Sequence, residues 1–138
     1  MDRTYIDETN RRVIEQFRAG GPVEGMHRER LVLLTTTGRR SGGAHTVPMM
    51  FHRDGDRVLV IASAAGAPRH PHWYLNLAAD PAVIVELPDE TYAGVAVTLT
   101  GEDRERTWGM LKETYSFFAA HEAQVDREIP VVDLRRAG

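Results

Sequence analysis

Hydrophobic residues recur at near-helical spacing among charged residues near the start of the chain. The stripe comprises Ile6, Val13, Ile14 and Phe17. It predicts an amphipathic helix over about residues 4–19, which the Gly20-Gly21-Pro22 stretch ends. Packing of such a stripe against the domain is the commonest use, so we expect packing. Alternatively, the arginines of this helix could bind a membrane surface, which would make the contact with the membrane peripheral.

Short apolar runs bounded by turn residues predict the strands. They cover residues 31–37, 46–53, 57–63, 82–87, 92–100 and 129–134. Asp54-Gly55 accepts positive φ and predicts a hairpin, whereas Pro48 predicts a strand edge or bulge because it cannot donate to a ladder. A short helix beginning near Pro71 and a longer one over residues 102–115 complete the pattern.

The order of these elements predicts the fold class. Three strands and a short helix follow the first helix, and then two strands, a helix and a last strand. Two consecutive hairpins favour a mainly antiparallel α+β barrel with flanking helices over a doubly wound parallel sheet. A length of 138 residues without a composition break predicts one domain over residues 1–138.

Composition excludes several classes of function. The chain has no cysteine, which excludes disulfides, thiolate metal sites and cysteine nucleophiles. A net charge of −3 does not favour nucleic-acid binding. There is no P-loop, no G-x-G-x-x-G and no G-x-S-x-G, so NTPases, dinucleotide-binding Rossmann enzymes and serine hydrolases have no signature here. His70 and His72 lack further metal ligands nearby, so we expect no metal. Without a signal peptide or an 18-residue apolar span, we expect a cytoplasmic protein.

A glycine-rich basic turn between the first two predicted strands carries the first candidate chemistry. Glycine frees the backbone so that several N–H groups can point at one anion, and Arg39 and Arg40 can add bidentate contacts. An exposed, merely solubilising hairpin is the alternative. The small residues 63–68 leave room for a flat group, and Trp73 and Tyr74 anchor the helix that follows. Gathered at one barrel mouth, these segments suit a ligand with a flat ring and a negatively charged end.

Two stretches closely resemble the deazaflavin-dependent nitroreductase family of actinobacteria. They are LLTTTGRRSGGAHTVPM and VLVIASAAGAPRHPHWYLNLAADPAVIVEL. The shared motifs are TTTGR-x-SG, AS-x-x-GA and P-x-WY-x-NL, within about residues 31–87 and a weaker tail to residue 132. The resemblance implies a split β-barrel of the FMN-binding type. It also implies binding of coenzyme F420, a deazaflavin with a phosphate and a polyglutamate tail.

The resemblance further implies a cofactor site built from four segments. The turn that contacts the anionic part comprises Arg39, Arg40 and Ser41. Two segments line the deazaflavin, one with His45, Thr46, Val47, Pro48, Met49 and Met50, the other with Ile61, Ala62, Ser63 and Ala64. The helix start that closes the site comprises His72, Trp73, Tyr74, Leu75 and Asn76.

The chain departs from the family pattern at four places. A basic residue is replaced by His45, a lysine by Ala64 and an aromatic residue by Met50. The loss of fixed charge predicts weaker binding of the tail. A tyrosine cluster of the best-known nitroreductases is replaced by a set comprising Tyr115, Phe118 and His121.

The expected activity is hydride transfer from the reduced deazaflavin to an electron-poor acceptor, namely a quinone, an enone or a nitro compound. An FMN-dependent reductase and a non-catalytic deazaflavin carrier remain alternatives. Ser63 is a candidate partner of the ring, and Tyr115 and His121 are candidate proton donors, with solvent or a merely solvated His121 as the alternative. On one continuous helix the last two would diverge by about 120°, so only one would face the pocket unless the helix breaks. An imidazole is the better acid near neutral pH.

Overall fold

The computed structural model describes residues 3–137, and within them the side chains of residues 8–137. The helices are α1 (Arg3–Arg18), α2 (His72–Ala79), α3 (Gly101–Thr114) and α4 (Phe117–Ala123), with 3₁₀ turns η1 (Arg28–Arg30) and η2 (Ala64–Gly66). The strands are β1 (Leu31–Thr37), β2 (Ala44–Met50), β3 (His52–Asp54), β4 (Arg57–Ile61), β5 (Ala82–Glu86), β6 (Thr91–Thr98) and β7 (Val131–Arg136).

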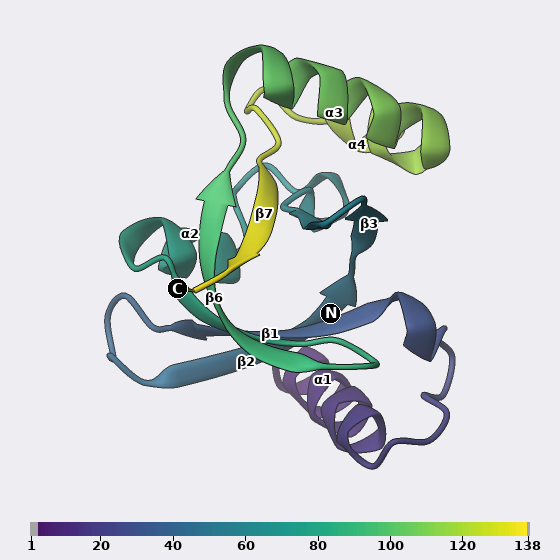
Figure 1. The fold of residues 1–138 in the computed structure, drawn as a ribbon, viewed down its shortest axis with the longest axis vertical. Helices are drawn as coiled ribbons and strands as arrows, with labels where there is room; N and C mark the ends of the chain where they lie inside the picture. The colour runs from purple at the N-terminus through teal and green to yellow at the C-terminus, as the bar shows by residue number, and fades with distance from the viewer. Residues whose placement is uncertain (1–2, 138) are drawn as a thin grey trace.

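All seven strands form one antiparallel sheet in the order β2-β1-β5-β6-β7-β4-β3. Its two edge strands, β2 and β3, are consecutive in the chain and separated only by Phe51. The sheet therefore has to curl until its edges meet at that residue, which gives the half-barrel in Figure 1. The α+β split-barrel prediction is confirmed. Pro48 lies in edge strand β2, as its missing N–H predicts.

Apolar side chains fill the inside of the curled sheet and cover two parts of its outside. The inner cluster includes Val32, Leu34, Val60 and Val132, each completely buried. A second cluster packs α3 and α4 against β4 and β7, at the end of the molecule opposite α1 (Figure 1). Burial of each such side chain contributes about 1.5–3 kcal/mol.

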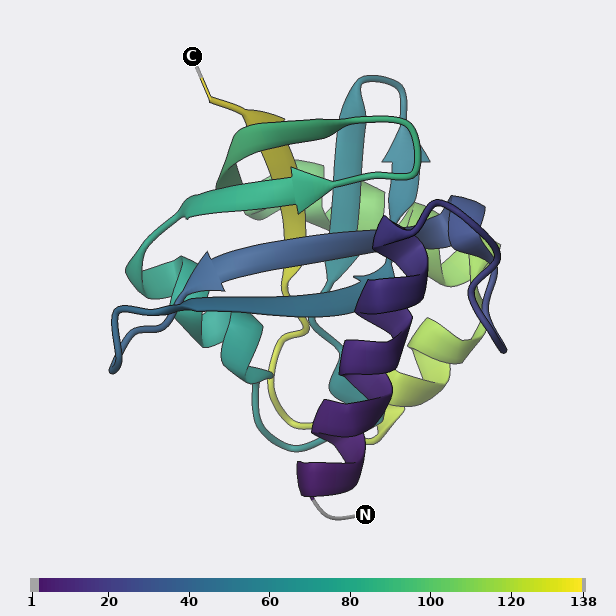
Figure 2. The same cartoon turned by 90° about the horizontal axis from the view of Figure 1, so that it is seen from below.

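Helix α1 lies across the outer face of β1 and β2 (Figure 2). Val13 and Phe17 are buried against Leu31 and Leu33, so the predicted packing of the stripe is confirmed for these positions. The side chain of Ile6, also predicted in the stripe, lies outside the described residues. No helix within residues 3–137 combines the length and apolar composition needed to cross a bilayer.

One predicted strand is wrong, and one helix was not predicted. Residues 46–53 do not form one strand, because the N–H of Phe51 donates to the carbonyl of Arg30 at 3.1 Å and its buried side chain turns the chain from one sheet edge to the other. The sequence also gave no prediction of α4. This helix is fastened to α3 by Glu122, whose carboxylate accepts from Trp108 Nε1 at 2.5 Å and Lys112 Nζ at 3.0 Å. These two hydrogen bonds lower the pKa of Glu122.

Candidate functional site

The basic turn of residues 38–43 joins β1 to β2 and is closed by its own backbone. The N–H of Gly38 donates to the carbonyl of Gly43 at 2.7 Å. Ser41 Oγ accepts from the N–H of Gly43 at 3.1 Å and lies 3.2 Å from Nε2 of His45. A Cβ at Gly38 would lie 2.6 Å from both of these side-chain atoms, so only glycine allows Ser41 and His45 to fold over the turn.

Arg39 joins this turn to helix α2. Its Nη1 donates to Oδ1 of Asn76 at 2.9 Å, and its Nη2 lies 3.4 Å from Nδ1 of His72. Asn76 is 5% exposed and donates in turn to Oγ1 of Thr36 at 3.2 Å. The buried amide therefore orients an exposed guanidinium, while the neighbouring Arg40 is exposed as well. The basic turn of residues 38–43 therefore contacts helix α2, and the prediction that these two segments lie together requires such a contact.

The loop of residues 63–67, called here the 63–67 loop, has an unusual backbone. Ala64 and Ala65 have φ values of 48° and 54°, in the left-handed region, where an L-residue costs about 1–2 kcal/mol. Arg127, which the sequence did not mark as a site residue, donates to three carbonyls here: Ala62 at 3.1 Å, Ser63 at 3.0 Å and Ala67 at 3.2 Å. No sequence motif marks Arg127, because its partners lie about 60 residues earlier.

The predicted proton donors both lie in one aromatic cluster next to this loop. His121 Nδ1 lies 3.3 Å from Ser63 Oγ, and the hydroxyl of Tyr115 lies 2.7 Å from Nδ1 of His52. The ring centroid of Phe117 lies 5.8 Å from that of Tyr115 and 5.6 Å from that of His121. The helix breaks between the two candidate donors, because Tyr115 is extended and separates α3 from α4.

Several of the remaining predicted residues pack against the inner cluster or against the cluster of α3 and α4. Met49, Trp73 and Tyr74 pack against the inner cluster, whereas Met50 and Ile61 pack with Tyr115 against the other. Ala62 is completely buried, and the exposed Ala64 lies in the 63–67 loop. Four further predicted residues lie on β2 or α2 and are partly buried: Thr46, Val47, Pro48 and Leu75. Thr46 Oγ1 lies 2.6 Å from Oγ1 of Thr35 on β1.

His70 connects the two halves of the predicted site. Its Nδ1 accepts from Arg127 Nη1 at 3.1 Å, and its ring centroid lies 5.0 Å from that of Tyr74 on α2. Burial lowers the pKa of His70, and the charge of Arg127 lowers it further. The imidazole is thus kept as a neutral acceptor between the 63–67 loop and the aromatic helix.

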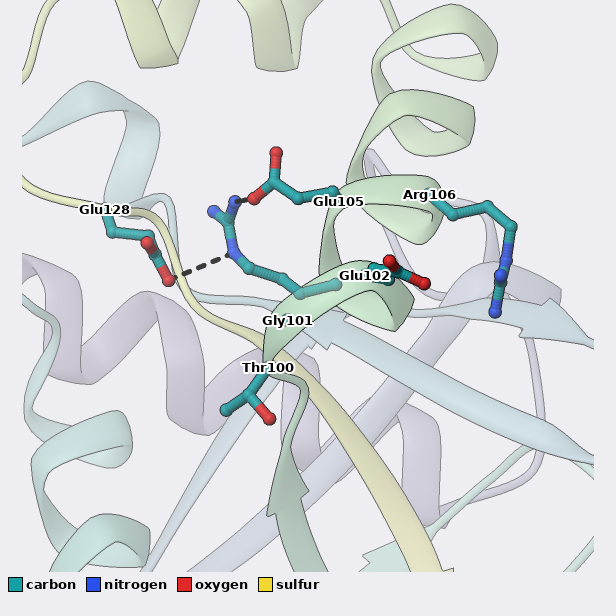
Figure 3. A pocket seen from close by; sticks show the side chains of 7 residues that line it. Thr100, Gly101, Glu102, Glu105, Arg106 and Glu128 are labelled. Atoms are coloured by element: carbon teal, nitrogen blue, oxygen red, sulfur yellow. Dashed lines mark hydrogen bonds and ion pairs between the residues drawn. The ribbon is translucent and has the colours of Figure 1, made fainter.

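Two surface hollows lie away from the predicted residues. One, of about 630 Å³, surrounds the start of α3 and includes Glu105 and Glu128 (Figure 3). There Arg104, 6% exposed, donates to Glu105 at 3.0 Å and to the carbonyl of Ile129 at 2.7 Å, and lies 3.2 Å from Glu128. This arginine fastens α3 to the segment before β7. The other hollow, of about 520 Å³, lies over β3, β4, β6 and β7.

Comparison with known proteins decides the family. A sequence model of the F420H(2)-dependent quinone reductases matches residues 8–135. The chain belongs to the F420H(2)-dependent quinone reductase family. Within this family of oxidoreductases, an F420H(2)-dependent quinone reductase of Mycobacterium tuberculosis (strain ATCC 25618 / H37Rv) is 33% identical over 108 residues, which are 76% of this chain and 72% of the relative.

Two solved structures extend this relationship to the fold. A structure described as an F420-H2 dependent reductase, FDR-A, is 37% identical with a TM-score of 0.70, and the match covers 80% of this chain and 100% of that one. A second, described as a domain-swapped dimer, is 35% identical with a TM-score of 0.71 and covers 96% of this chain and 98% of that one. This chain is thus similar in fold to an F420-H2 dependent reductase.

The donor groups of this quinone reductase family member fit an anionic, flat cofactor. Arg39 and Arg40 present guanidinium groups at the surface, as a phosphate or carboxylate requires. The 63–67 loop has no large side chain, and its main chain is held in a strained shape at Ala64 and Ala65, while its Ser63 lies next to His121. Strain of this kind concentrates at ligand sites.

The connection through His70 predicts a pH dependence of stability. The pKa of His70 is lower in the folded chain than the ordinary value of about 6.5. As pH falls below about 6.5, the unfolded chain takes up this proton before the folded chain does, so the free energy of unfolding should fall. Urea denaturation at pH 7.5, 6.5 and 5.5 should show a smaller decline in His70→Gln, whose amide does not titrate. His27→Gln, at a strongly exposed position, is the control and should decline like the wild type. Equal declines in all three proteins would contradict the prediction.

Proposed function

We propose that this chain uses reduced coenzyme F420 to reduce a quinone by hydride transfer. The observation that carries the proposal is the family match over residues 8–135. The reduced deazaflavin, when bound, supplies the hydride, and the protein supplies binding, orientation and exclusion of water. Enones and nitro compounds are further acceptors of the same electron-poor class.

The geometry suggests a role for each part of the predicted site. Arg39 and Arg40 hold the anionic end, and the bond from Arg39 to Asn76 keeps that end close to α2. The 63–67 loop, with Met50 and Ile61 nearby, lies along the ring. Trp73 and Tyr74 cover it from α2. We also propose, from the continuous sheet that joins β1 to β7, that residues 1–138 act as one domain.

The first experiment compares cofactors. We expect coenzyme F420 to bind more tightly than FMN, because FMN has a single phosphate and lacks the polyglutamate charge that the two arginines would meet. Fluorescence titration of the purified chain with each cofactor measures both affinities. Equal or reversed affinities would favour the FMN-dependent alternative.

A second measurement separates an enzyme from a carrier. The chain is loaded with reduced coenzyme F420 and mixed with quinones, enones or nitro compounds, and oxidation is followed by absorbance. Oxidation that depends on both protein and acceptor supports the proposed activity. Tight binding without accelerated oxidation would indicate a deazaflavin carrier.

A further inference from the structure

Arg127 holds the 63–67 loop through a geometry that only a guanidinium can provide. Its Nη1, Nη2 and Nε donate to the carbonyls of Ala62, Ser63 and Ala67. Nη1 also lies 3.1 Å from Nδ1 of His70. The guanidinium fork is rigid and planar, whereas the single ammonium of a lysine is a compact point charge. Because its nitrogens already have these partners, Arg127 acts on the loop and not directly on a ligand.

The contacts of Arg127 determine where the neighbouring N–H groups point. A trans peptide directs its C=O and N–H to opposite sides. Since Arg127 holds the carbonyls of Ala62 and Ser63, the N–H groups of Ser63 and Ala64 point to the other side of the loop. No backbone carbonyl within residues 3–137 accepts a hydrogen bond from either N–H.

The backbone conformation brings these N–H groups together. Ser63 has φ −77° and ψ −28°, in the right-handed region, and Ala64 follows with φ 48°, in the left-handed region. Successive N–H groups in this combination form a concave site for a negatively charged or carbonyl oxygen. Ser63 Oγ, 3.3 Å from His121, belongs to the same segment.

We propose that Arg127 is a positioning residue that shapes the 63–67 loop so that the N–H groups of Ser63 and Ala64 bind a ring oxygen of the ligand. The proposal rests on the function proposed above, because a deazaflavin ring carries the carbonyl oxygens that would accept these hydrogen bonds. Arg127 thereby links the segment before β7 to the loop that follows β4.

The test compares Arg127→Lys with a matched control. Arg57→Lys is the control, because Arg57 is also half-buried and multiply bonded, to Asp54, Asp103 and Thr107, yet contacts no predicted site residue. We expect Arg127→Lys to weaken binding of coenzyme F420 at least about tenfold, and Arg57→Lys by less than about twofold. Fluorescence titration measures the affinities, and thermal unfolding shows whether both variants lose similar stability.

Amide NMR spectra provide a readout that does not depend on activity. In the ¹⁵N-labelled wild type, the coenzyme should shift the amide signals of Ser63 and Ala64. In Arg127→Lys these two signals should already be displaced without coenzyme, and in Arg57→Lys they should stay in place.

The outcomes separate this inference from the proposed function. Wild-type protein that does not bind coenzyme F420 contradicts the proposed function; the amide signals of Arg127→Lys without coenzyme then still decide whether Arg127 shapes the loop. Wild-type affinity in Arg127→Lys overturns the inference. If Arg127→Lys does not fold, the wild type still provides a test. The inference is overturned if the amide signals of Ser63 and Ala64 in the wild type do not shift when the coenzyme binds.

Discussion

Replacing both Arg39 and Arg40 by alanine is expected to weaken binding of coenzyme F420 at least about a hundredfold at low salt. A hydrogen bond to a charged group contributes about 1.5–3 kcal/mol, and each 1.4 kcal/mol corresponds to about a tenfold change in Kd. The loss should shrink as salt rises, because both arginines are exposed and exposed charge pairs are screened. Fluorescence titration at low and high ionic strength measures both effects.

The two arginines differ in their contacts within the protein. Arg39 also donates to Asn76 at 2.9 Å, so Arg39→Ala loosens the turn from α2, whereas Arg40→Ala mainly removes charge from an exposed position. We therefore expect the larger single effect at Arg39. Arg11→Ala with Arg12→Ala is the matched control, because it removes the same charge from an exposed face of α1. Unchanged affinity at low salt in the Arg39/Arg40 double variant would leave the turn only a solubilising role.

His121→Ala is expected to lower turnover of an activated enone about a hundredfold or more at pH 7, the usual contribution of a general acid. His121 lies beside Ser63 and the 63–67 loop, whereas the hydroxyl of Tyr115 is directed to His52. Tyr115→Phe should therefore retain most of the wild-type rate. Steady-state kcat between pH 6 and 9, with reduced coenzyme F420 in excess, measures both variants.

A second substitution separates proton donation from support of Ser63. The amide of His121→Gln can still hydrogen-bond Ser63 Oγ but is not an acid that can donate a proton, so this variant should be as slow as His121→Ala. If it recovers the wild-type rate, His121 only supports Ser63. Wild-type rates in His121→Ala and Tyr115→Phe alike would assign the proton to solvent.

The strands and turns that depend on residues close together in the sequence were predicted best. The apolar run before Gly38 and the glycines of the turn predicted β1, the basic turn and the start of β2, because strand propensity and turn chemistry act over a few residues. The same holds for the β3–β4 hairpin, where Gly55 has the positive φ of 59° that the Asp-Gly pair predicts.

The features that were missed depend on partners that lie far away in the sequence. Arg127 meets its carbonyls across about 60 residues, and His52 meets Tyr115 across 63. The end of α3 was predicted to within one residue, but α4, which begins at Phe117, was missed. Phe118 packs in one cluster with Trp108 and Leu111 of α3, so tertiary packing supports this short helix.

The position of β7 affects how the chain folds during its synthesis. This strand is the last in residues 3–137, yet it lies inside the sheet, between β6 and β4. Until residues 131–136 have been synthesised, β4 and β6 each have an edge without its native partner, and such edges can pair wrongly or aggregate. A nascent chain that ends before Val131 can form the β2-β1-β5-β6 and β4-β3 pairings but cannot join them. Completion of the barrel therefore follows translation of its C-terminal strand.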